Sequence, residues 1–306
     1  YITFENDYIE SVWWLLSQLH KKGLLYKGYT IQPYSPAAGT GLSSHELNLP
    51  GCYKNVKDTT VVAQFKLVRE EASEFLFDED DEDVRLLAWT TTPWTLPSNT
   101  ALGVGKKITY VKVQTFNKYT GAPVSAILAE DLVSRWFSPE GAEAPMEYKA
   151  GDKLIPYRIQ QQYKGAALEG LRYEQLLPYA QPEDGDAFKV LIGDFVSTED
   201  GTGIVHLAPS FGADDRRTAQ QYGMGSLTLV DKSGRFTEEA GELAGRFVKN
   251  YKDDPEWENP DIDIAVALKQ ENKAFNVAKY EHNYPHCWRT DKPVLYYPLD
   301  SWFVRA

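Results

Sequence analysis

Short strand-like runs at close spacing dominate the chain from about residue 58 onward, and they constrain the fold more than any other feature. The runs "TVVAQFKLV", "VRLLAWTTT", "ITYVKVQTF", "VSAILAE", "AFKVLIGDFV" and "GTGIVHLA" are β-branched or aromatic and are separated by turn residues. Many short strands with few helices favour a sheet that closes on itself. We therefore expect a mixed α/β fold whose central domain, residues 58–275, is barrel-like.

Helical segments interrupt and precede these strands. Residues 6–22 carry apolar side chains at helical spacing, and Gly23 ends the pattern. Two further helices are expected, from near Asp214 to Gly223 and from about Asp261 to Glu271. The flanks, 1–57 and 276–306, are assigned to another body, with a loop-rich stretch over 29–53. They are expected to pair with each other, because the ends of an inserted domain lie close together.

Composition excludes several classes of protein. The 306 residues carry a net charge of −12, which argues against broad, nonspecific nucleic-acid binding but not against holding one end of a nucleic acid. No apolar run approaches the ~18–20 residues that span a bilayer. Two distant cysteines, Cys52 and Cys287, favour a reducing cytoplasm. The acidic run 70–83 is expected to be a solvated loop, and both chain ends are expected to continue into a longer protein.

Hydroxyl side chains crowd the end of one strand, in "LLAWTTTPWTLPSN". Alternation along a strand turns Thr90 and Thr92 to one face and Thr91 to the other. Pro93 ends the ladder, because it has no N–H to donate. Such a cluster offers donors and acceptors but no good acid, base or nucleophile, so the sequence predicts a pocket built to hold a ligand.

A second candidate stretch is "EDGTGIVHLAPSFGADD", residues 199–215. Gly201 and Gly203 permit a tight turn, and "IVHLA" is expected to be a strand that carries His206. Asp214 and Asp215 then open a helix, whose N-terminal amides favour ionised carboxylates. A carboxylate held ionised at the mouth of a pocket is a natural partner for a substrate ammonium group.

Other chemistries have little support in the sequence. Ser210, His206 and Asp215 are present, but no nucleophile elbow surrounds the serine. A P-loop or dinucleotide fingerprint is absent. Zinc sites usually use paired cysteines at C-x₂₋₄-C spacing, and none occurs near His286 and Cys287. We expect no metal site and no cofactor in this chain.

These motifs together resemble the editing domain of isoleucyl-tRNA synthetases. That domain is the large insertion, connective peptide one, in the Rossmann-type catalytic domain of these class I enzymes. "WTTTPWTLPSN" and "DGTGIVHLAPSFGADD" are its most specific motifs, and "NDYIESVWWLLSQLHKKGLLYKGYTIQPYSPAAGTGLSSHE" and "YPHCWRTDKPVLYYPLDSWFV" resemble the segments that enter and leave it. The HIGH-type and KMSKS-type signatures are absent. The resemblance therefore implies no aminoacylation by this chain, because ATP and Mg²⁺ would bind elsewhere in the parent enzyme.

The resemblance implies a role for each candidate residue. Asp215 would bind the α-ammonium of a misattached valine, Thr92 with Thr90 and Thr91 would surround the ester and hold water, and His206 would line the amino-acid pocket. The catalytic candidates are thus Thr92, His206 and Asp215. The remaining candidates, expected to bind substrate, are Thr90, Thr91, Thr95, Asn99 (near the terminal adenosine) and Asp214.

The implied activity is hydrolysis of the ester of valine on tRNA(Ile) by positioned water, with no evident general base. The implied partners are the 3′ CCA end of that tRNA and the rest of the synthetase, with no membrane and a monomeric state. Two alternatives remain open: a module that binds the tRNA 3′ end without hydrolysis, and an editing domain of the valyl type that acts on threonine.

Overall fold

The computed structural model describes residues 2–305 of the chain. The helices are α1 (Asn6–Lys21), α2 (Ser44–Leu47), α3 (Val133–Trp136), α4 (Ala213–Gln221) and α5 (Pro260–Gln270). The strands are β1 (Leu25–Ser35), β2 (Thr40–Gly41), β3 (Tyr53–Lys66), β4 (Val84–Thr90), β5 (Ala101–Val104), β6 (Thr109–Phe116), β7 (Pro123–Ala129), β8 (Arg158–Lys164), β9 (Lys189–Ile192), β10 (Ile204–Leu207), β11 (Ala274–Pro285) and β12 (Leu295–Val304). Short 3₁₀ turns include η2 (Pro93–Ser98), directly after β4.

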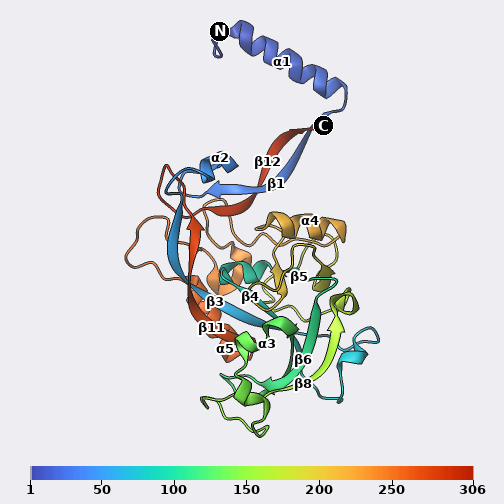
Figure 1. Cartoon of the computed structure of the whole chain (residues 1–306). Helices are drawn as coiled ribbons and strands as arrows, with labels where there is room; N and C mark the ends of the chain where they lie inside the picture. Colours follow the sequence, from blue (N-terminus) through green and yellow to red (C-terminus); the bar gives the residue numbers. More distant parts are fainter. Residues whose placement is uncertain (1, 306) are drawn as a thin grey trace.

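A curled, mixed sheet of nine strands forms the body of the molecule (Figure 1). Its order is β8-β6-β7-β4-β10-β5-β9, and β3 joins β4 to β11 outside this path. The predicted mixed α/β fold with a barrel-like sheet is confirmed. Closure is incomplete, since no ladder joins β8 to β9 within residues 2–305.

Strand β4 is the branch point of this sheet. Strand β3 pairs along residues 85–90 of β4, while β7 pairs with residues 84–86 and β10 pairs at Trp89. Because a strand has only two edges, β7 and β10 share the edge that β3 leaves free. Seven consecutive side chains of β4 are buried or nearly so, as is typical of a strand covered on both faces.

The two flanks pair with each other, as predicted. β1 and β12 form an antiparallel ribbon from Leu25↔Val304 to Tyr34↔Leu295. The loop expected over 29–53 is therefore wrong at its start, because residues 29–35 belong to β1. The expected domain boundaries at 57/58 and 275/276 fall inside β3 and β11, which pair with each other on both sides of them, with a register shift between Ala274 and Asn276.

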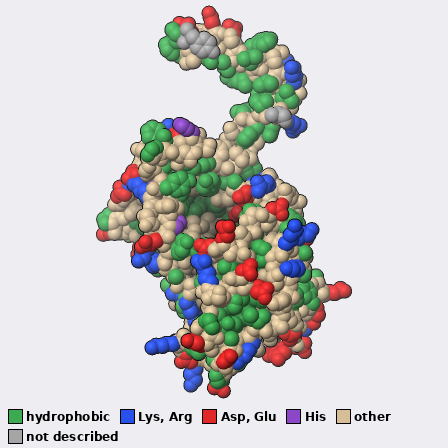
Figure 2. All heavy atoms as spheres, in the orientation of Figure 1, with side chains coloured by type: hydrophobic (Ala, Val, Ile, Leu, Met, Phe, Trp, Pro, Cys, Tyr) green, Lys and Arg blue, Asp and Glu red, His purple; other side chains and the backbone are tan. Residues whose placement is uncertain are grey.

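Helix α1 confirms the predicted helix of 6–22 but lies apart from the body, beyond the β1–β12 ribbon (Figure 1). None of its side chains is buried, and several of its hydrophobic side chains lie open to solvent (Figure 2). Trp13 and Trp14 are 67% and 60% exposed. The amphipathic pattern therefore describes a helix on which several apolar side chains stay exposed: Ile9, Val12, Trp13, Trp14 and Leu15.

The acidic run 70–83 is more than a solvated loop, and this corrects our expectation. Lys112, on β6, is fully buried, and its ammonium group donates to Asp78 Oδ2 at 2.6 Å, Glu82 Oε1 at 3.0 Å and the Leu76 carbonyl at 3.0 Å. A buried cation needs such compensation, because desolvation penalises its charge. Part of the acidic run therefore folds over the sheet to neutralise Lys112.

We expect Lys112→Ala to lower the free energy of unfolding by about 3 kcal/mol, because it leaves the partly buried Glu82 carboxylate without its cation. Urea unfolding measures the effect. Lys232→Ala, at an exposed position, is the matched control and should change stability by no more than about 0.5 kcal/mol. A loss below about 1 kcal/mol for Lys112→Ala would contradict this account.

Candidate active site

The two candidate motifs meet because their strands are parallel neighbours. β4 and β10 pair in parallel at Trp89 and Val205, so the carboxyl ends of both strands lie at one edge of the sheet. The segment 90–99, which we call the threonine bend, begins at the end of β4 and includes η2. The helix α4 follows β10. Between them lies a cleft of about 220 Å³, whose lining residues are Trp89, Thr90, Thr91, Thr92, Thr95, Val205, His206, Ala208, Phe211 and Asp215.

The threonines form a linked set of hydroxyls along the bend. Thr90 Oγ1 lies 3.3 Å from Thr92 Oγ1 and accepts from the Thr92 amide at 3.1 Å. Thr92 Oγ1 lies 3.5 Å from Thr95 Oγ1, and the Thr95 hydroxyl donates to the Thr92 carbonyl at 2.8 Å. Pro93 opens the 3₁₀ turn η2, which brings Thr92 and Thr95 to one side. These contacts hold three hydroxyls at the wall of the cleft.

His206 is buried in the floor with both ring nitrogens occupied. The Asn99 amide nitrogen donates to the carbonyls of Ala101 and Leu207, which fixes its orientation, and it also contacts His206 Nδ1 at 2.8 Å. Nδ1 must therefore accept, so the proton lies on Nε2, which donates to Thr95 Oγ1 at 3.0 Å. Burial lowers the pKa of His206 to about 3. The ring is thus neutral near pH 7, with no lone pair free to take a proton from water.

Asp215 lies in the first turn of α4 and faces the cleft. Its Oδ2 accepts from the Ala208 amide at 2.8 Å. We expected the helix N-terminus to keep this carboxylate ionised, but burial raises the pKa of Asp215 to about 6, and backbone amides offset the shift only in part. The effect of desolvation on the pKa is therefore larger than that of the amides at the helix N-terminus. A cationic partner would stabilise the ionised form of this carboxylate.

Two predicted residues lie outside the cleft. Asn99 is buried beneath His206, where the Tyr173 hydroxyl donates to its Oδ1 at 2.7 Å. Asp214 points to solvent and pairs with Arg217 at 2.8 Å. Asn99 therefore supports His206 from behind the cleft, and Asp214 takes no part in the lining.

Sequence reasoning missed the apolar lining of the cleft. Trp89, Val205, Ala208 and Phe211 belong to it. Phe211 follows β10 in "PSFG", and its ring packs edge-on against Trp94 at 5.1 Å. Trp89 and Val205 lie inside the two motifs, directly before Thr90 and His206 on the paired strands, and this position is a signal that would have indicated them.

The structure does not bring Ser210 to His206 as a nucleophile. Ser210 Oγ lies 2.6 Å from Thr228 Oγ1, while His206 contacts Thr95 and Asn99. Within residues 2–305, no three His, Cys, Asp or Glu side chains come together as metal ligands. The cleft therefore offers hydroxyls, one carboxylate and apolar walls.

No helix in the described part of the chain is long and apolar enough to cross a membrane.

Comparison with known proteins gives a consistent set of relatives. The family model of the class I tRNA synthetases (I, L, M and V) matches residues 1–306. Isoleucine–tRNA ligase of Cytophaga hutchinsonii is 58% identical over 330 aligned residues, and that of Bacteroides fragilis is 54% identical over 336. Each alignment covers 100% of this chain and 29% of the relative, so the chain spans under a third of the curated proteins it matches.

Solved structures with a similar backbone include GlLeuRS-CP1, at 18% identity and a TM-score of 0.47, covering 72% of this chain and 99% of that chain. The cytosolic leucyl-tRNA synthetase editing domain of P. knowlesi is 14% identical with a TM-score of 0.46, covering 74% and 97%. The family match over the whole chain and the identity to isoleucine–tRNA ligases confirm the resemblance found in the motifs. The chain therefore belongs to the class I tRNA synthetases (I, L, M and V).

Proposed function

We propose that this chain is the editing domain of an isoleucyl-tRNA synthetase and hydrolyses the ester of valine mischarged on tRNA(Ile). One observation carries the proposal: a single cleft joins the threonine bend to the carboxylate of Asp215 and contains no nucleophile of its own. A cleft of this kind suits a substrate that brings a cation and an ester, and a reaction in which water attacks.

In this proposal Asp215 binds the α-ammonium group of the aminoacyl moiety. The carboxylate is partly buried, so pairing with a cation would relieve the cost of its desolvation. The ester would then lie against the hydroxyls of Thr90 and Thr92. Anchoring at one end fixes where the carbonyl carbon lies relative to the bend.

The attacking water would be held by the threonine hydroxyls, with a hydroxyl of the terminal ribose assisting. No residue of the cleft is an evident general base, because His206 is neutral and both its nitrogens are bonded. Much of the rate would therefore come from proximity and orientation, which can contribute about 7–11 kcal/mol in well-oriented systems. His206 would act as a rigid part of the wall.

Selectivity would come from exclusion by size. Isoleucyl-tRNA synthetases are themselves a standard example of how hard it is to discriminate isoleucine from valine by binding alone. The two differ by one methylene, which contributes only about 1–3 kcal/mol to binding in an apolar pocket. A second, smaller cleft with rigid walls rejects isoleucine and admits valine. The apolar wall of Phe211, Val205 and the floor of His206 suit this role.

The partners in this proposal are the 3′ CCA end of tRNA(Ile) and the rest of the synthetase, in the cytoplasm and as a monomer. The remaining 71% of a relative's length would supply ATP-dependent aminoacylation with Mg²⁺, since the chain covers 29% of it. Arg216, at the start of α4, lies over the ring of Tyr29 at 4.5 Å, which ties the candidate site to the flanking ribbon.

We expect Asp215→Ala, in the full-length synthetase, to lower kcat/KM for deacylation of Val-tRNA(Ile) roughly 10- to 100-fold, because a hydrogen bond to a charged group contributes about 1.5–3 kcal/mol. Deacylation is followed with tRNA(Ile) carrying valine, isoleucine or threonine. Asp214→Ala is the matched control, since that exposed neighbour does not line the cleft. If the wild-type enzyme deacylates Thr-tRNA(Ile) but not Val-tRNA(Ile), the result favours an editing domain of the valyl type. If the wild-type enzyme deacylates neither, the result favours a module that only binds the tRNA 3′ end.

The pH dependence of kcat/KM should report the pKa of Asp215. Only the ionised carboxylate binds the ammonium group, so kcat/KM should fall as the pH drops through about 6. Rates are divided by those of uncatalysed deacylation at each pH, and Asp215→Asn should flatten the profile. A profile unchanged down to pH 5 would contradict the assignment.

The same pKa makes a prediction about stability. Because the folded-state pKa is above the ordinary value of 3.8, the protonated form is favoured by folding, and this contribution is lost as the pH rises through about 6. At pH 7.5 Asp215→Asn should therefore raise the free energy of unfolding in urea while it lowers kcat/KM for deacylation. If the free energy of unfolding of Asp215→Asn is equal to or lower than that of the wild type, the carboxylate of Asp215 is not destabilised by burial.

Gly212→Ala tests the position of the carboxylate without removing it. A Cβ at residue 212 would lie 2.5 Å from Asp215 Cγ, while the extended backbone there (φ −138°) accepts alanine. The carboxylate must turn aside, so we expect KM for Val-tRNA(Ile) to rise roughly tenfold with little change in melting temperature. Gly103→Ala, whose Cβ would meet side chains at 3.5 Å or more, is the control. An unchanged KM would show that the carboxylate's position is not critical.

A further inference from the structure

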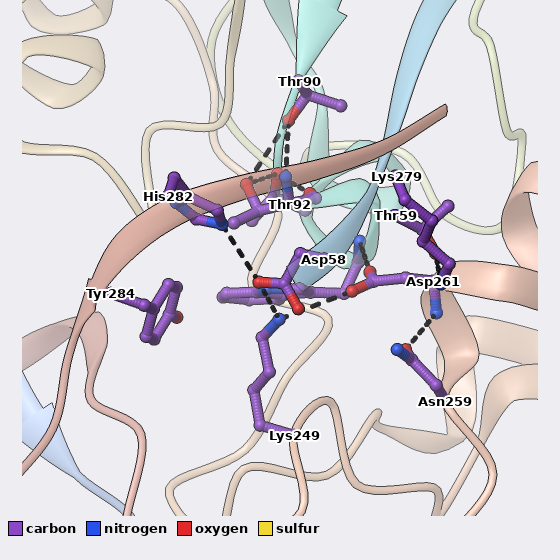
Figure 3. Close-up of polar contacts among 12 residues, drawn as sticks. Asp58, Thr59, Thr90, Thr92, Lys249, Asn259, Asp261, Lys279, His282 and Tyr284 are labelled. Atoms are coloured by element: carbon purple, nitrogen blue, oxygen red, sulfur yellow. Dashed lines mark hydrogen bonds and ion pairs between the residues drawn. The ribbon is translucent and has the colours of Figure 1, made fainter. Parts of the chain in front are cut away.

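A second cluster of charged side chains is buried behind the threonine bend (Figure 3). Lys249 Nζ lies 3.1 Å from Asp58 Oδ2 and 3.5 Å from Asp261 Oδ2. His282 Nε2 lies 3.2 Å from the same oxygen, Asp58 Oδ2, and the ring of Tyr284 lies 5.1 Å from the ammonium group. These groups come from β3, β11, α5 and the chain before α5, so the cluster joins four separate segments.

One member of this cluster reaches the candidate active site. Asp261 is fully buried in the first turn of α5, and its Oδ1 accepts from the amide of Trp94 at 2.8 Å. Trp94 lies within η2, between Thr92 and Thr95. The carboxylate therefore holds the bend at its middle residue, while the hydroxyls of its two neighbours face the cleft.

Two further hydrogen bonds of Thr95 lie within the bend, and one joins the bend to another segment. Thr95 donates to the carbonyl of Thr92, and the Thr95 amide bonds the same carbonyl at 3.0 Å, both within the bend. The contact between Thr95 and His206 joins the bend to the strand β10. The Asp261 contact joins the opposite side of the bend to α5, so the two together clamp it.

Charge balance explains why a lysine accompanies this carboxylate. Burial raises the pKa of Asp261 to about 6, and the ammonium of Lys249 and the Trp94 amide oppose that shift. For Lys249, burial alone would lower the pKa, but the carboxylates of Asp261 and Asp58 raise it. The pair thus stabilises each partner in its charged form, and a charged carboxylate is the stronger acceptor for an amide.

We propose that Asp261 and Lys249 are positioning residues of the editing cleft. Asp261 fixes the Trp94 amide, and with it the bend that presents Thr92 and Thr95, while Lys249 holds the carboxylate in place. The inference rests on the proposed function of the cleft, and it assigns these residues no contact with substrate.

The experiment compares three variants of the full-length synthetase. Asp261→Asn keeps an oxygen that can accept from Trp94. The double variant Lys249→Met with Asp261→Leu removes this pair and the acceptor, and apolar side chains of similar size often replace a buried ion pair without loss of stability. Asp58, which also loses Lys249, keeps His282 at 3.2 Å, and the melting temperature shows whether the variant is folded. Asp263→Ala, two residues along on α5 and 54% exposed in its side chain, is the control.

Two readouts are taken for each variant. The first is kcat and KM for deacylation of Val-tRNA(Ile), and the second is hydrogen–deuterium exchange of the peptide 89–99 in the absence of tRNA. We expect the double variant to exchange faster in this peptide and to lose roughly tenfold or more in kcat, with KM within about twofold because Asp215 is untouched. Asp261→Asn and Asp263→Ala should stay within about threefold of the wild-type kcat.

Each result supports or overturns a distinct claim. A double variant with wild-type kcat, or with unchanged exchange of the bend, overturns the positioning role. A loss of melting temperature with no change in kcat well below that temperature does so too, because it would show a purely structural pair. A wild type that does not deacylate Val-tRNA(Ile) overturns the proposed function instead, while the exchange data still decide whether Asp261 anchors the bend.

Discussion

The parallel pairing of β4 and β10 is the contact on which the candidate site depends. It places Trp89 beside Val205, so the two segments that follow these strands leave the sheet at the same edge. Thr95 and His206, which are 111 positions apart, come within hydrogen-bond distance as a result. Because β3 takes the other edge of β4, the pairing leaves little freedom for either motif to move relative to the other.

Buried charge and buried polarity are handled differently around this site. His206 is kept neutral, with Asn99 and Thr95 satisfying both nitrogens. Lys249, behind the bend, and Lys112, farther away on β6, are each paired with carboxylates brought from distant parts of the chain. Such groups are costly when unpaired, so their partners must arrive together as the sheet assembles. These paired polar groups join segments from distant parts of the chain around the cleft, in addition to its apolar packing.

Much of the local structure could be predicted from the sequence, and the errors have a common cause. The β-branched runs located β4, β6, β7 and β10, and the motifs indicated the bend and Asp215. The strand β1 was missed because its Pro33 and neighbouring glycines suggest a loop, while its pairing partner lies about 270 positions away in β12. The pKa of Asp215 was misjudged because a helix terminus is visible in the sequence and desolvation is not. Burial and long-range pairing are properties of the folded chain, so local patterns report them poorly.

The cleft combines a carboxylate that can anchor a cation with hydroxyls and an apolar wall. If hydrolysis occurs there, the rate must come from where the water and the ester are held, and an error of about 1 Å in such a geometry can cost a factor of a hundred. The contacts behind the bend then matter as much as those that face the substrate. A fold that surrounds Thr92 and Thr95 with fixed partners on both sides, His206 on one and Asp261 through Trp94 on the other, meets that requirement without any residue that is itself reactive.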